Sequence, residues 1–503
     1  MDYSVNGILS ALAESGAADA NPGLRNIVKA LNTLGNGTDL NALTGGGALR
    51  IESLNPVMAA ATVENKHFKF FNMLLPSRRD VWSMMDQAVR KNDIGGFAGS
   101  AIATETGVGQ AFRQGDYQRL VTELGVFSVR RNLPLVTAFQ GAMQAQAGIV
   151  DFQAAEEEDL NAVLEILVSV ENSLFYGNKG ANASSIDGLF AQLDANAPNN
   201  VIDLRGEVLN SHTQMTKLCA KLTSVGAWGS PDQAFMSPLV KADLDDKLEV
   251  GYRLNLDTSV SSATTGVPLR GMRYSSVGIA DGEVKFDASA FIDETKLPVG
   301  VNYASQCTIP AATSIAGAAV AAGAANSKWI DGTNGGTAYT VAGAYHYAVE
   351  AWIPGQVSLP VATASAVTVA ATGAVDLTIT SGGTETYYNI FRSKKGGSND
   401  PAQMRFIATV KRTAGSTTVF RDLNATIPGS SEVPILTSAP KANAIQWLQM
   451  LPLTKIPFAM TDFSYPWGAI LLGALRLATP KRHGYIKNVI PTYAKTSQGW
   501  FPF

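Results

Sequence analysis

The sequence predicts an α+β fold that is interrupted by a separate all-β segment. Three features of the chain support this prediction: an amphipathic helical pattern over 156–177, a long two-stranded pattern over 78–140, and a sharp change of composition over 305–437. Helical and strand periodicities are mixed on both sides of the last segment, whereas only strand periodicity runs through it.

The helix expected over 156–177 has apolar residues at three- and four-residue spacing, which is typical of one buried face. These residues are Leu160, Val163, Leu164, Leu167, Val170 and Leu174. Acidic residues fill positions 156–159, where carboxylates interact favourably with the helix dipole, and Gly177 is a suitable stop. The acidic run is therefore interpreted as a helix start and not as a metal site.

Two segments before this helix have few contacts of their own. Residues 1–55 combine short helical pieces with glycine runs, and we expect an arm that needs a surface to lie on. The 78–140 pattern has an outgoing limb near 80–91, a polar tip and a return limb at 121–131. It predicts an extended hairpin that projects and docks on a neighbour.

Two further helices are expected after residue 200. The first spans 211–225, with a stripe of Met215, Leu218, Cys219, Leu222 and Val225. The second begins at Ser237-Pro238, a cap followed by proline at the first helical position, and continues through Val240, Leu244 and Leu248.

The segment 305–437 is rich in Ala, Gly, Thr, Ser and Val. Its alternating strands are separated by turns at intervals of roughly eight to twelve residues, which is the pattern of a β-sandwich. From residue 438 the composition returns to the earlier type. The β segment is therefore expected to be an insertion into another domain.

Composition excludes several classes of function. Only 16% of the 503 residues are charged, against about 25% in typical soluble domains, which suggests that other subunits cover much of the surface. The net charge of −3 does not indicate the excess of basic residues that is typical of a nucleic-acid-binding protein. The lone cysteines, Cys219 and Cys307, indicate a reducing compartment. The chain shows no secretory signal and no apolar run long enough for a bilayer, so we expect a soluble protein.

No catalytic, cofactor or metal site is predicted, and we expect no enzyme. The histidines have neither metal-ligand spacing nor a nucleophile nearby: His67, His212, His346 and His483. The glycine-containing stretch 106–110 lacks the lysine and third glycine of a phosphate loop. The candidate contact residues are Arg113, Arg119, Arg130 and Arg131 on the expected hairpin. They are either solvated or paired with acidic patches of neighbouring subunits, and the scarcity of charge favours the second interpretation.

Several separated stretches resemble the major capsid proteins of tailed bacteriophages, which have the Hong Kong 97-type fold. They are Glu171-Asn172-Ser173-Leu174-Phe175-Tyr176-Gly177, Ile202-Asp203-Leu204-Arg205-Gly206, Trp228-Gly229-Ser230-Pro231 and the run 451–489. The resemblance implies an N-terminal arm over 1–55 and a capsid core over 56–304. That core would hold an extended loop over 78–140, a peripheral domain with a spine helix over 156–177, and an axial domain. The chain would return to the core over 438–503.

The β segment 305–437 has a resemblance of its own. Tyr387–Ser393, Phe406–Val410 and Thr417–Asp422 look like strands of a fibronectin type III or immunoglobulin-like sandwich. Tyr345–Ala351 looks like a late strand of such a module, although it comes first. The module is either circularly permuted or built with strands from a partial first repeat.

The resemblance implies a major capsid protein of a tailed double-stranded DNA bacteriophage. Copies of the chain would assemble as hexamers and pentamers in the host cytoplasm into the icosahedral head of the virion. The shell would enclose DNA without sequence-specific binding and without a membrane, beside portal, scaffold or decoration proteins. The alternative is the shell protein of an encapsulin-like nanocompartment. A secreted adhesin is suggested by the β module alone, and the lack of a signal peptide disfavours it.

Overall fold

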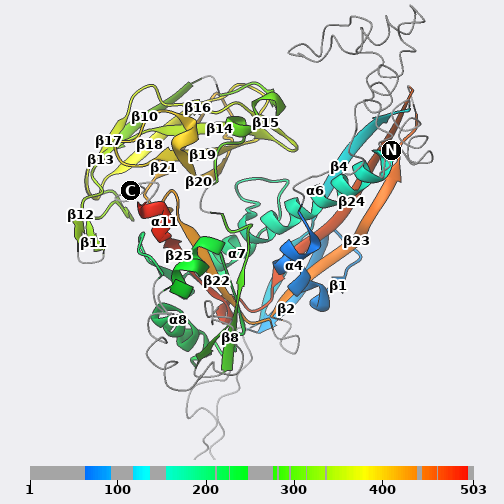
Figure 1. Ribbon diagram of the computed structural model, residues 1–503, viewed down its shortest axis with the longest axis horizontal. Helices are drawn as coiled ribbons and strands as arrows, with labels where there is room; N and C mark the ends of the chain where they lie inside the picture. The colour runs from blue at the N-terminus through cyan, green and yellow to red at the C-terminus, as the bar shows by residue number, and fades with distance from the viewer. Residues whose placement is uncertain are drawn as a thin grey trace, which may run out of the picture. The chain divides into compact units, whose positions relative to one another are not determined.

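The structure is a computed structural model that describes residues 63–91, 117–135, 154–209, 212–225, 227–246, 276–279, 282–293, 296–312, 314–334, 337–438, 444–460 and 463–496. Figure 1 shows the helices and strands of these residues. The expected arm, 1–55, and the tip of the expected hairpin lie outside them. Among the described residues, no helix is long and apolar enough to cross a membrane.

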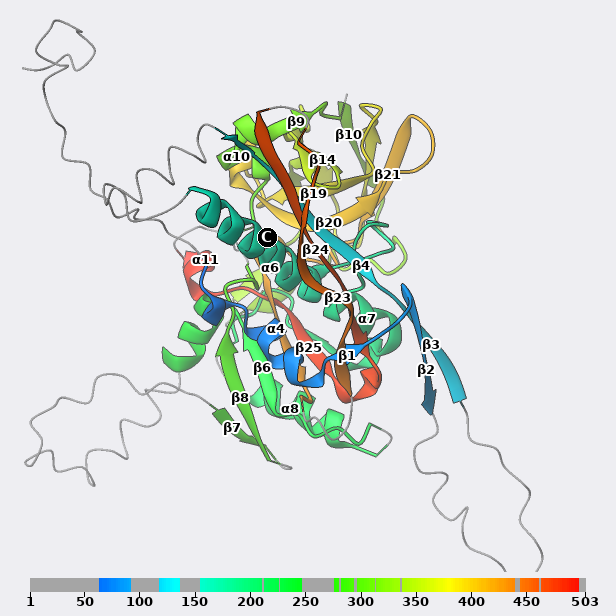
Figure 2. The same cartoon turned by 90° about the vertical axis from the view of Figure 1, so that its right-hand side faces the viewer.

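The helix predicted over 156–177 is α6 (Ala154–Tyr176), and it lies along a four-stranded sheet. The sheet has the order β1-β23-β24-β4, with β1 at Arg79–Asp80, β23 at Ile445–Pro457, β24 at Ser464–Leu477 and β4 at Gly125–Pro134. Figures 1 and 2 both show α6 beside β24, although more than 280 positions separate them in the sequence. This layer forms one core of the protein.

The buried face of α6 differs in phase from the predicted stripe. The buried residues follow four-residue steps: Ala162, Ile166, Val170 and Leu174. Val170 and Leu174 of the predicted stripe are buried, and Val163, Leu164 and Leu167 are half-buried. Leu160 is 51% exposed, so its assignment to the buried face was wrong. The middle of the helix is apolar on more than one side, so spacing alone leaves its rotation undetermined.

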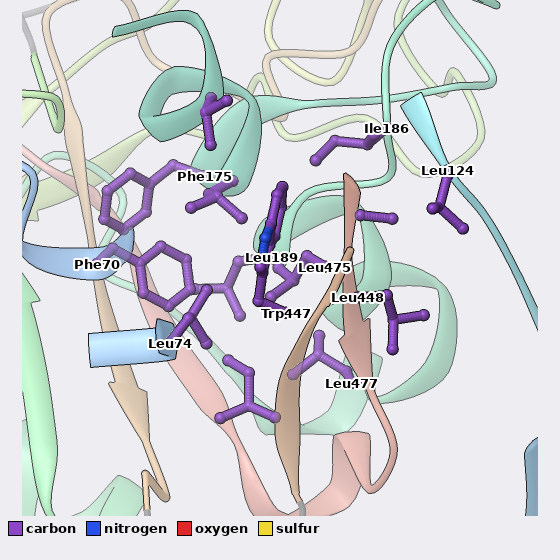
Figure 3. Close-up of a cluster of buried hydrophobic side chains, with 14 of the residues drawn as sticks. Phe70, Leu74, Leu124, Phe175, Ile186, Leu189, Trp447, Leu448, Leu475 and Leu477 are labelled. Atoms are coloured by element: carbon purple, nitrogen blue, oxygen red, sulfur yellow. The ribbon is translucent and has the colours of Figure 1, made fainter. Parts of the chain in front are cut away.

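Aromatic and leucine side chains fill the space between α6, its sheet and the short helix α4 (Lys69–Leu74). Figure 3 shows Phe70 and Leu74 of α4 near Phe175 of α6 and Trp447 of β23. The helix α7 (Leu189–Asn196) adds Leu189, Phe190 and Leu193 to the same cluster. Gly473 of β24 lies directly against the Trp447 ring, where a Cβ would collide with it.

A second core lies on a six-stranded sheet of order β5-β25-β22-β6-β8-β7. The strands are Val201–Asp203, Gly484–Val489, Ser431–Leu436, Gln233–Met236, Gly282–Ala288 and Ser276–Ile279. The helix α8 (Thr213–Thr223) buries Met215, Leu218, Cys219 and Leu222 in this core, which confirms that part of the predicted stripe. Val225 is 86% exposed because the helix ends at Thr223, so its assignment to the stripe was wrong.

The third predicted helix is present over 238–246. The Ser237 hydroxyl accepts a hydrogen bond from the Val240 N–H at 3.3 Å, as expected of an N-cap. Val240 and Leu244 are buried in the second core. Leu248 lies outside the described residues.

Most strands of residues 307–422 form two packed sheets, beside two short two-stranded pairs. One has the order β10-β18-β21, and the other has the order β20-β19-β14-β15-β9 with β16 paired to β14. The main strands are β9 (Cys307–Ile309), β10 (Ser314–Val320), β14 (Tyr347–Ile353), β15 (Gln356–Ser358), β18 (Ala374–Thr380), β19 (Tyr387–Ser393), β20 (Met404–Lys411) and β21 (Thr417–Asp422). Shorter strands are β11 (Gly332–Asn334), β12 (Thr337–Tyr339), β13 (Gly343–Tyr345), β16 (Val361–Ala362) and β17 (Val367–Val369).

A buried ion pair crosses the core of these two sheets. Arg392 of β19 donates from Nη1 to Asp422 Oδ2 at 2.5 Å, and from Nη2 to Asn424 Oδ1 at 2.6 Å. Its guanidinium also lies over the Trp329 ring, 4.6 Å from the centroid. The Tyr347 hydroxyl donates to the same Asp422 oxygen. These contacts compensate two charges that are almost wholly removed from water.

The end of the expected insertion differs from the structure. The strand β22 (Ser431–Leu436) falls inside the predicted range 305–437, yet it pairs with β25 and β6 in the centre of the six-stranded sheet. The composition of 431–436 is strand-like on either assignment, so it does not reveal which sheet the strand joins. The core sheet therefore resumes before residue 438.

The expected hairpin over 78–140 is paired along only part of its length. β2 (Met85–Lys91) and β3 (Tyr117–Glu123) form a two-stranded antiparallel ribbon. From Gly125 the return limb becomes β4 and pairs with β24 instead of the outgoing limb. The apolar run of β24 offers a longer and more buried partner, so the second half of the return limb belongs to the first core.

Candidate assembly surfaces

The ribbon of β2 and β3 has one exposed face that carries apolar side chains. Because residues alternate between faces, the register places Met85, Val89, Tyr117 and Val121 on the same side. Val89 is 72% exposed and Tyr117 is 66% exposed. We call these four residues the ribbon patch. A ribbon this short gains little by folding alone, so such a patch is typical of a surface that another molecule covers.

The root of the ribbon is fixed to the first core. Arg476 of β24, which is buried, donates from Nη1 to Asp86 Oδ2 and from Nη2 to Gln446 Oε1. Lys179 forms an ion pair with Glu123 at the end of β3. These contacts hold the ribbon at its base, while the ribbon patch stays exposed to solvent.

A second apolar surface lies at the turn between β23 and β24. Its exposed residues are Leu453, Ile456, Phe458, Met460 and Phe463, of which Phe463 is 87% exposed. We call this group the hairpin patch. It lies beside the Pro134 end of β4, whereas the ribbon joins the opposite end of β4, at Gly125, so the described residues carry two separate exposed apolar surfaces.

The four candidate arginines have different environments. Arg119 lies on β3 directly opposite Val89, on the face of the ribbon patch. Arg130 of β4 lies over the Phe458 ring of the hairpin patch, 5.8 Å from the centroid. Arg131 forms ion pairs within the chain, at 2.6 Å to Glu165. Arg113 lies outside the described residues.

Two carboxylates near the start of α6 pair with cations on strands of its own sheet. Arg131 also pairs with Glu158 at 3.6 Å, and Lys455 of β23 pairs with Asp159 at 2.5 Å. The acidic run thus fixes the helix to the sheet as well as facing the helix dipole. A contact of Arg131 with a neighbouring subunit stays a prediction.

A buried carboxylate connects α6 to α4. Glu171 is fully buried, and its Oε1 and Oε2 accept hydrogen bonds from the backbone N–H groups of Phe70 and Phe71, both at 2.9 Å. Burial raises the pKa of Glu171 to about 7, against the lowering effect of these two hydrogen bonds. No role was predicted for Glu171, because a single glutamate in a helix has no local signature of burial.

The chain that follows the two-sheet segment 307–422 is attached to the core through Asn488 of β25. Its side chain donates to Asp203 Oδ1 at 2.8 Å and to the Ala425 carbonyl at 3.1 Å, and it accepts from the Ile427 N–H at 3.0 Å. Asn488 has a φ of +58°, a conformation that asparagine tolerates better than most residues. Ile490 and Ala494 then pack into the core of the two sheets. The two parts are thus joined by several contacts besides the chain connections.

A polar cavity of about 220 Å³ lies beside this junction. It is lined by residues of both parts, including Tyr176, Lys296, Phe406 and Glu432. The Tyr176 hydroxyl donates to Glu432 Oε2 at 3.0 Å, and burial raises the pKa of Glu432 to about 7. The ammonium of Lys296 lies 4.3 Å from the centroid of the Phe406 ring. Contacts within the chain thus hold these side chains in the wall of the cavity.

The histidines have structural positions. His483 is fully buried; its Nδ1 accepts from the Thr437 N–H at 3.2 Å, and burial lowers its pKa to about 4. His212 is the N-cap residue of α8, as expected, and His346 lies between β13 and β14. Within the described ranges, no group of three or more His, Cys, Asp or Glu side chains is arranged to hold a metal ion.

Comparison with known proteins finds local sequence similarity to major capsid proteins of bacteriophages. Over 73 residues the chain is 34% identical to the major capsid protein of Staphylococcus phage K. The major capsid protein of Staphylococcus phage S25-3 matches to the same extent. The matched stretch covers 14% of this chain and only 15% of each relative. No protein-family model matches the chain.

Solved structures whose backbones can be partly superposed on this one include capsids and an encapsulin. The capsid of Mycobacterium phage Ogopogo has a TM-score of 0.41 and 9% identity, over 88% of this chain and 99% of that chain. A capsid of a native GTA particle has a TM-score of 0.41 and 7% identity, over 89% of this chain and 98% of that one. The encapsulin of Synechococcus elongatus PCC 7942 has a TM-score of 0.39 and 8% identity, over 88% and 94%. TM-scores this low carry no conclusion about fold or function.

Proposed function

We propose that the chain is the major capsid protein of a tailed double-stranded DNA bacteriophage. The observation that carries this proposal is the 34% identity over 73 residues to phage major capsid proteins. The similarity is local, so the shell, its hexamers and pentamers, and its location in the virion are parts of the proposal. In the same proposal, assembly occurs in the host cytoplasm, and portal, scaffold or decoration proteins are the partners.

The exposed surfaces support a subunit that assembles. The ribbon patch and the hairpin patch leave large apolar side chains in water, and each carries an arginine. Copies of the chain that cover these side chains would gain about 1–2 kcal/mol for each one buried. Repetition of such weak contacts around a closed shell gives the assembly its stability.

The proposal also assigns roles to the elements. In a Hong Kong 97-type subunit, α6 is the spine helix, the β2–β3 ribbon is the base of the extended loop, and the six-stranded sheet with α8 is the axial domain. The two-sheet segment is an inserted immunoglobulin-like module. The DNA would be enclosed without sequence-specific contacts, which agrees with a net charge of −3.

Electron microscopy of the expressed full-length chain tests the proposal. The wild-type chain is expected to form closed particles. Replacing Val89 by Asp places a charge in the ribbon patch and should abolish particles, while the circular dichroism of the subunit stays unchanged. Val419→Asp is the matched control, because Val419 is a 59% exposed valine on β21, outside both patches.

Two outcomes of this experiment contradict the proposal. A wild-type chain that stays monomeric at all concentrations is not a shell protein. Particles that form equally well from Val89→Asp would exclude the ribbon patch from the assembly contacts. The cargo separates the two kinds of shell: DNA in heads purified from infected cells supports a capsid, whereas packaged enzyme indicates an encapsulin-like compartment.

A further inference from the structure

The strand β10 (Ser314–Val320) forms one edge of the three-stranded sheet β10-β18-β21. It pairs with β18 at all seven positions, without a shift of register. In an antiparallel ladder, alternate residues direct their N–H and C=O groups to one neighbour and the others direct theirs away. The open side of β10 therefore presents a regular row of backbone donors and acceptors.

Other long edges of the described sheets carry features that hinder pairing with another strand. Charged residues and proline are the usual ones. β4 contains Arg130, Arg131 and Pro134, and β20 contains Arg405 and Lys411. In β10 there is neither charge nor proline, and the sequence has no charged residue between Lys296 and Lys328. Among described edge strands of seven or more residues, β10 alone is unprotected in this way.

The side chains of β10 leave this backbone row accessible. Gly317 faces the interior, where a Cβ would collide with the Val367 side chain. Ala316 and Ala318 are exposed and point to the outer face. In Figures 1 and 2 the strand lies at the rim of the two-sheet segment. The contact that β10 offers to another strand is therefore made by its backbone N–H and C=O groups and not by its small side chains.

We propose that β10 pairs antiparallel with β10 of a second copy of this chain, around a two-fold axis at Gly317. The two three-stranded sheets would then become one continuous sheet across the interface. This register sets Ser314 opposite Val320, and Ala316 opposite Ala318. Around a two-fold axis each strand pairs with an identical strand, so a single charged residue near the centre would lie close to the same charge on the second copy. The lack of any charge therefore favours a second copy over a charged peptide as the occupant.

Cysteine pairs in the full-length chain test this contact without requiring particles. Residues opposite each other in a ladder have Cβ atoms about 4.5–5.5 Å apart, close to what a disulfide needs. Ser314→Cys/Val320→Cys is the reporter, because these positions lie at opposite ends of one strand and can only be joined between copies. We expect a disulfide-linked dimer after mild oxidation, at least tenfold more than the wild-type chain gives with Cys219 and Cys307.

Charged variants in the reporter chain identify the edge that makes the contact. Ala316→Lys/Ala318→Lys should lower the dimer at least tenfold, and mixing it with Ala316→Glu/Ala318→Glu should restore it. Val419→Lys on β21 is the control and should have no effect. The proposal is overturned if the reporter gives no dimer, if the lysines do not lower it, if mixing does not restore it, or if Val419→Lys lowers it equally. If the reporter forms no dimer, the edge of β10 is either covered by a different protein or exposed to solvent.

Discussion

Replacing Glu171 by Gln removes the titrating group that connects α6 to α4. Its folded pKa of about 7 is above the ordinary value of 4.5, so the folded state binds the proton more tightly than the unfolded state. Its contribution is therefore complete at low pH and is lost as the pH rises from 4.5 through 7. The difference corresponds to about 3 kcal/mol in total, of which about 2 kcal/mol falls between pH 5.5 and pH 8.

Glutamine cannot titrate, and it offers one acceptor oxygen to two backbone N–H groups. One buried donor then lacks a partner, which lowers the free energy of unfolding by about 1–3 kcal/mol. The sharper measurement is urea unfolding of unassembled subunits between pH 5.5 and pH 8. Over this interval the wild type should lose about 2 kcal/mol more stability than Glu171→Gln does.

Other titrating groups affect both proteins equally, so the comparison isolates Glu171. Burial also raises the pKa of Glu350 and of Glu432 to about 7, whereas it lowers that of His483 to about 4. Glu157→Gln, at a half-exposed position of the same helix, is the control and should follow the wild type. Equal pH dependence of Glu171→Gln and wild type would refute the reasoning.

Three further changes test the other contacts. Asp422→Asn leaves the buried guanidinium of Arg392 without its carboxylate and should lower the free energy of unfolding by about 3–5 kcal/mol, measured by thermal unfolding. Asp376→Asn, in the more exposed pair with Arg421, is the control and should lower it by less than about 1 kcal/mol. Asn488→Ala removes four hydrogen bonds, one of them a 3.4 Å bond from the Ser430 hydroxyl, and should cost about 2–4 kcal/mol. An unchanged melting temperature would contradict its role as a connector. Deletion of 305–437 removes β22 and should give insoluble chain, whereas deletion of 305–429 with a short glycine linker should give more soluble protein.

The positions of the helices along the chain were predicted better than the faces that they bury. Composition and spacing located α6 and α8, since each is long enough to show a period. The buried face of α6 was predicted only in part, with Val170 and Leu174 correct and Leu160 wrong, because apolar residues occur on more than one side of its middle turns. The sheet alone decides that Ala162 and Ile166 face inward. Periodicity describes one element, whereas burial depends on the element that packs against it.

Contacts between distant segments had no signal in the sequence. The partners of Glu171 are about 100 positions away, and those of Asn488 include Asp203, which is 285 positions away. Each is one polar residue whose role depends on the backbone groups that the fold brings beside it. A carboxylate between buried residues such as Val170 and Leu174 is the only hint, and it does not name the partner. Of the candidate arginines, Arg119, Arg130 and Arg131 lie on described strands, and Arg131 pairs inside the chain.

The distribution of apolar side chains separates folding from assembly. The buried clusters of the first core and of the two-sheet segment contain large side chains such as Trp447 and Trp329, while the ribbon patch lies outside every cluster of the described residues. Val89 therefore contributes little to the stability of an isolated subunit, since a 72% exposed side chain has little burial to lose. A charge at this position should leave subunit unfolding unchanged while it prevents particle formation. If Val89→Asp instead lowered the melting temperature of the subunit, the ribbon would belong to the fold, and it could not serve as a separate contact between copies.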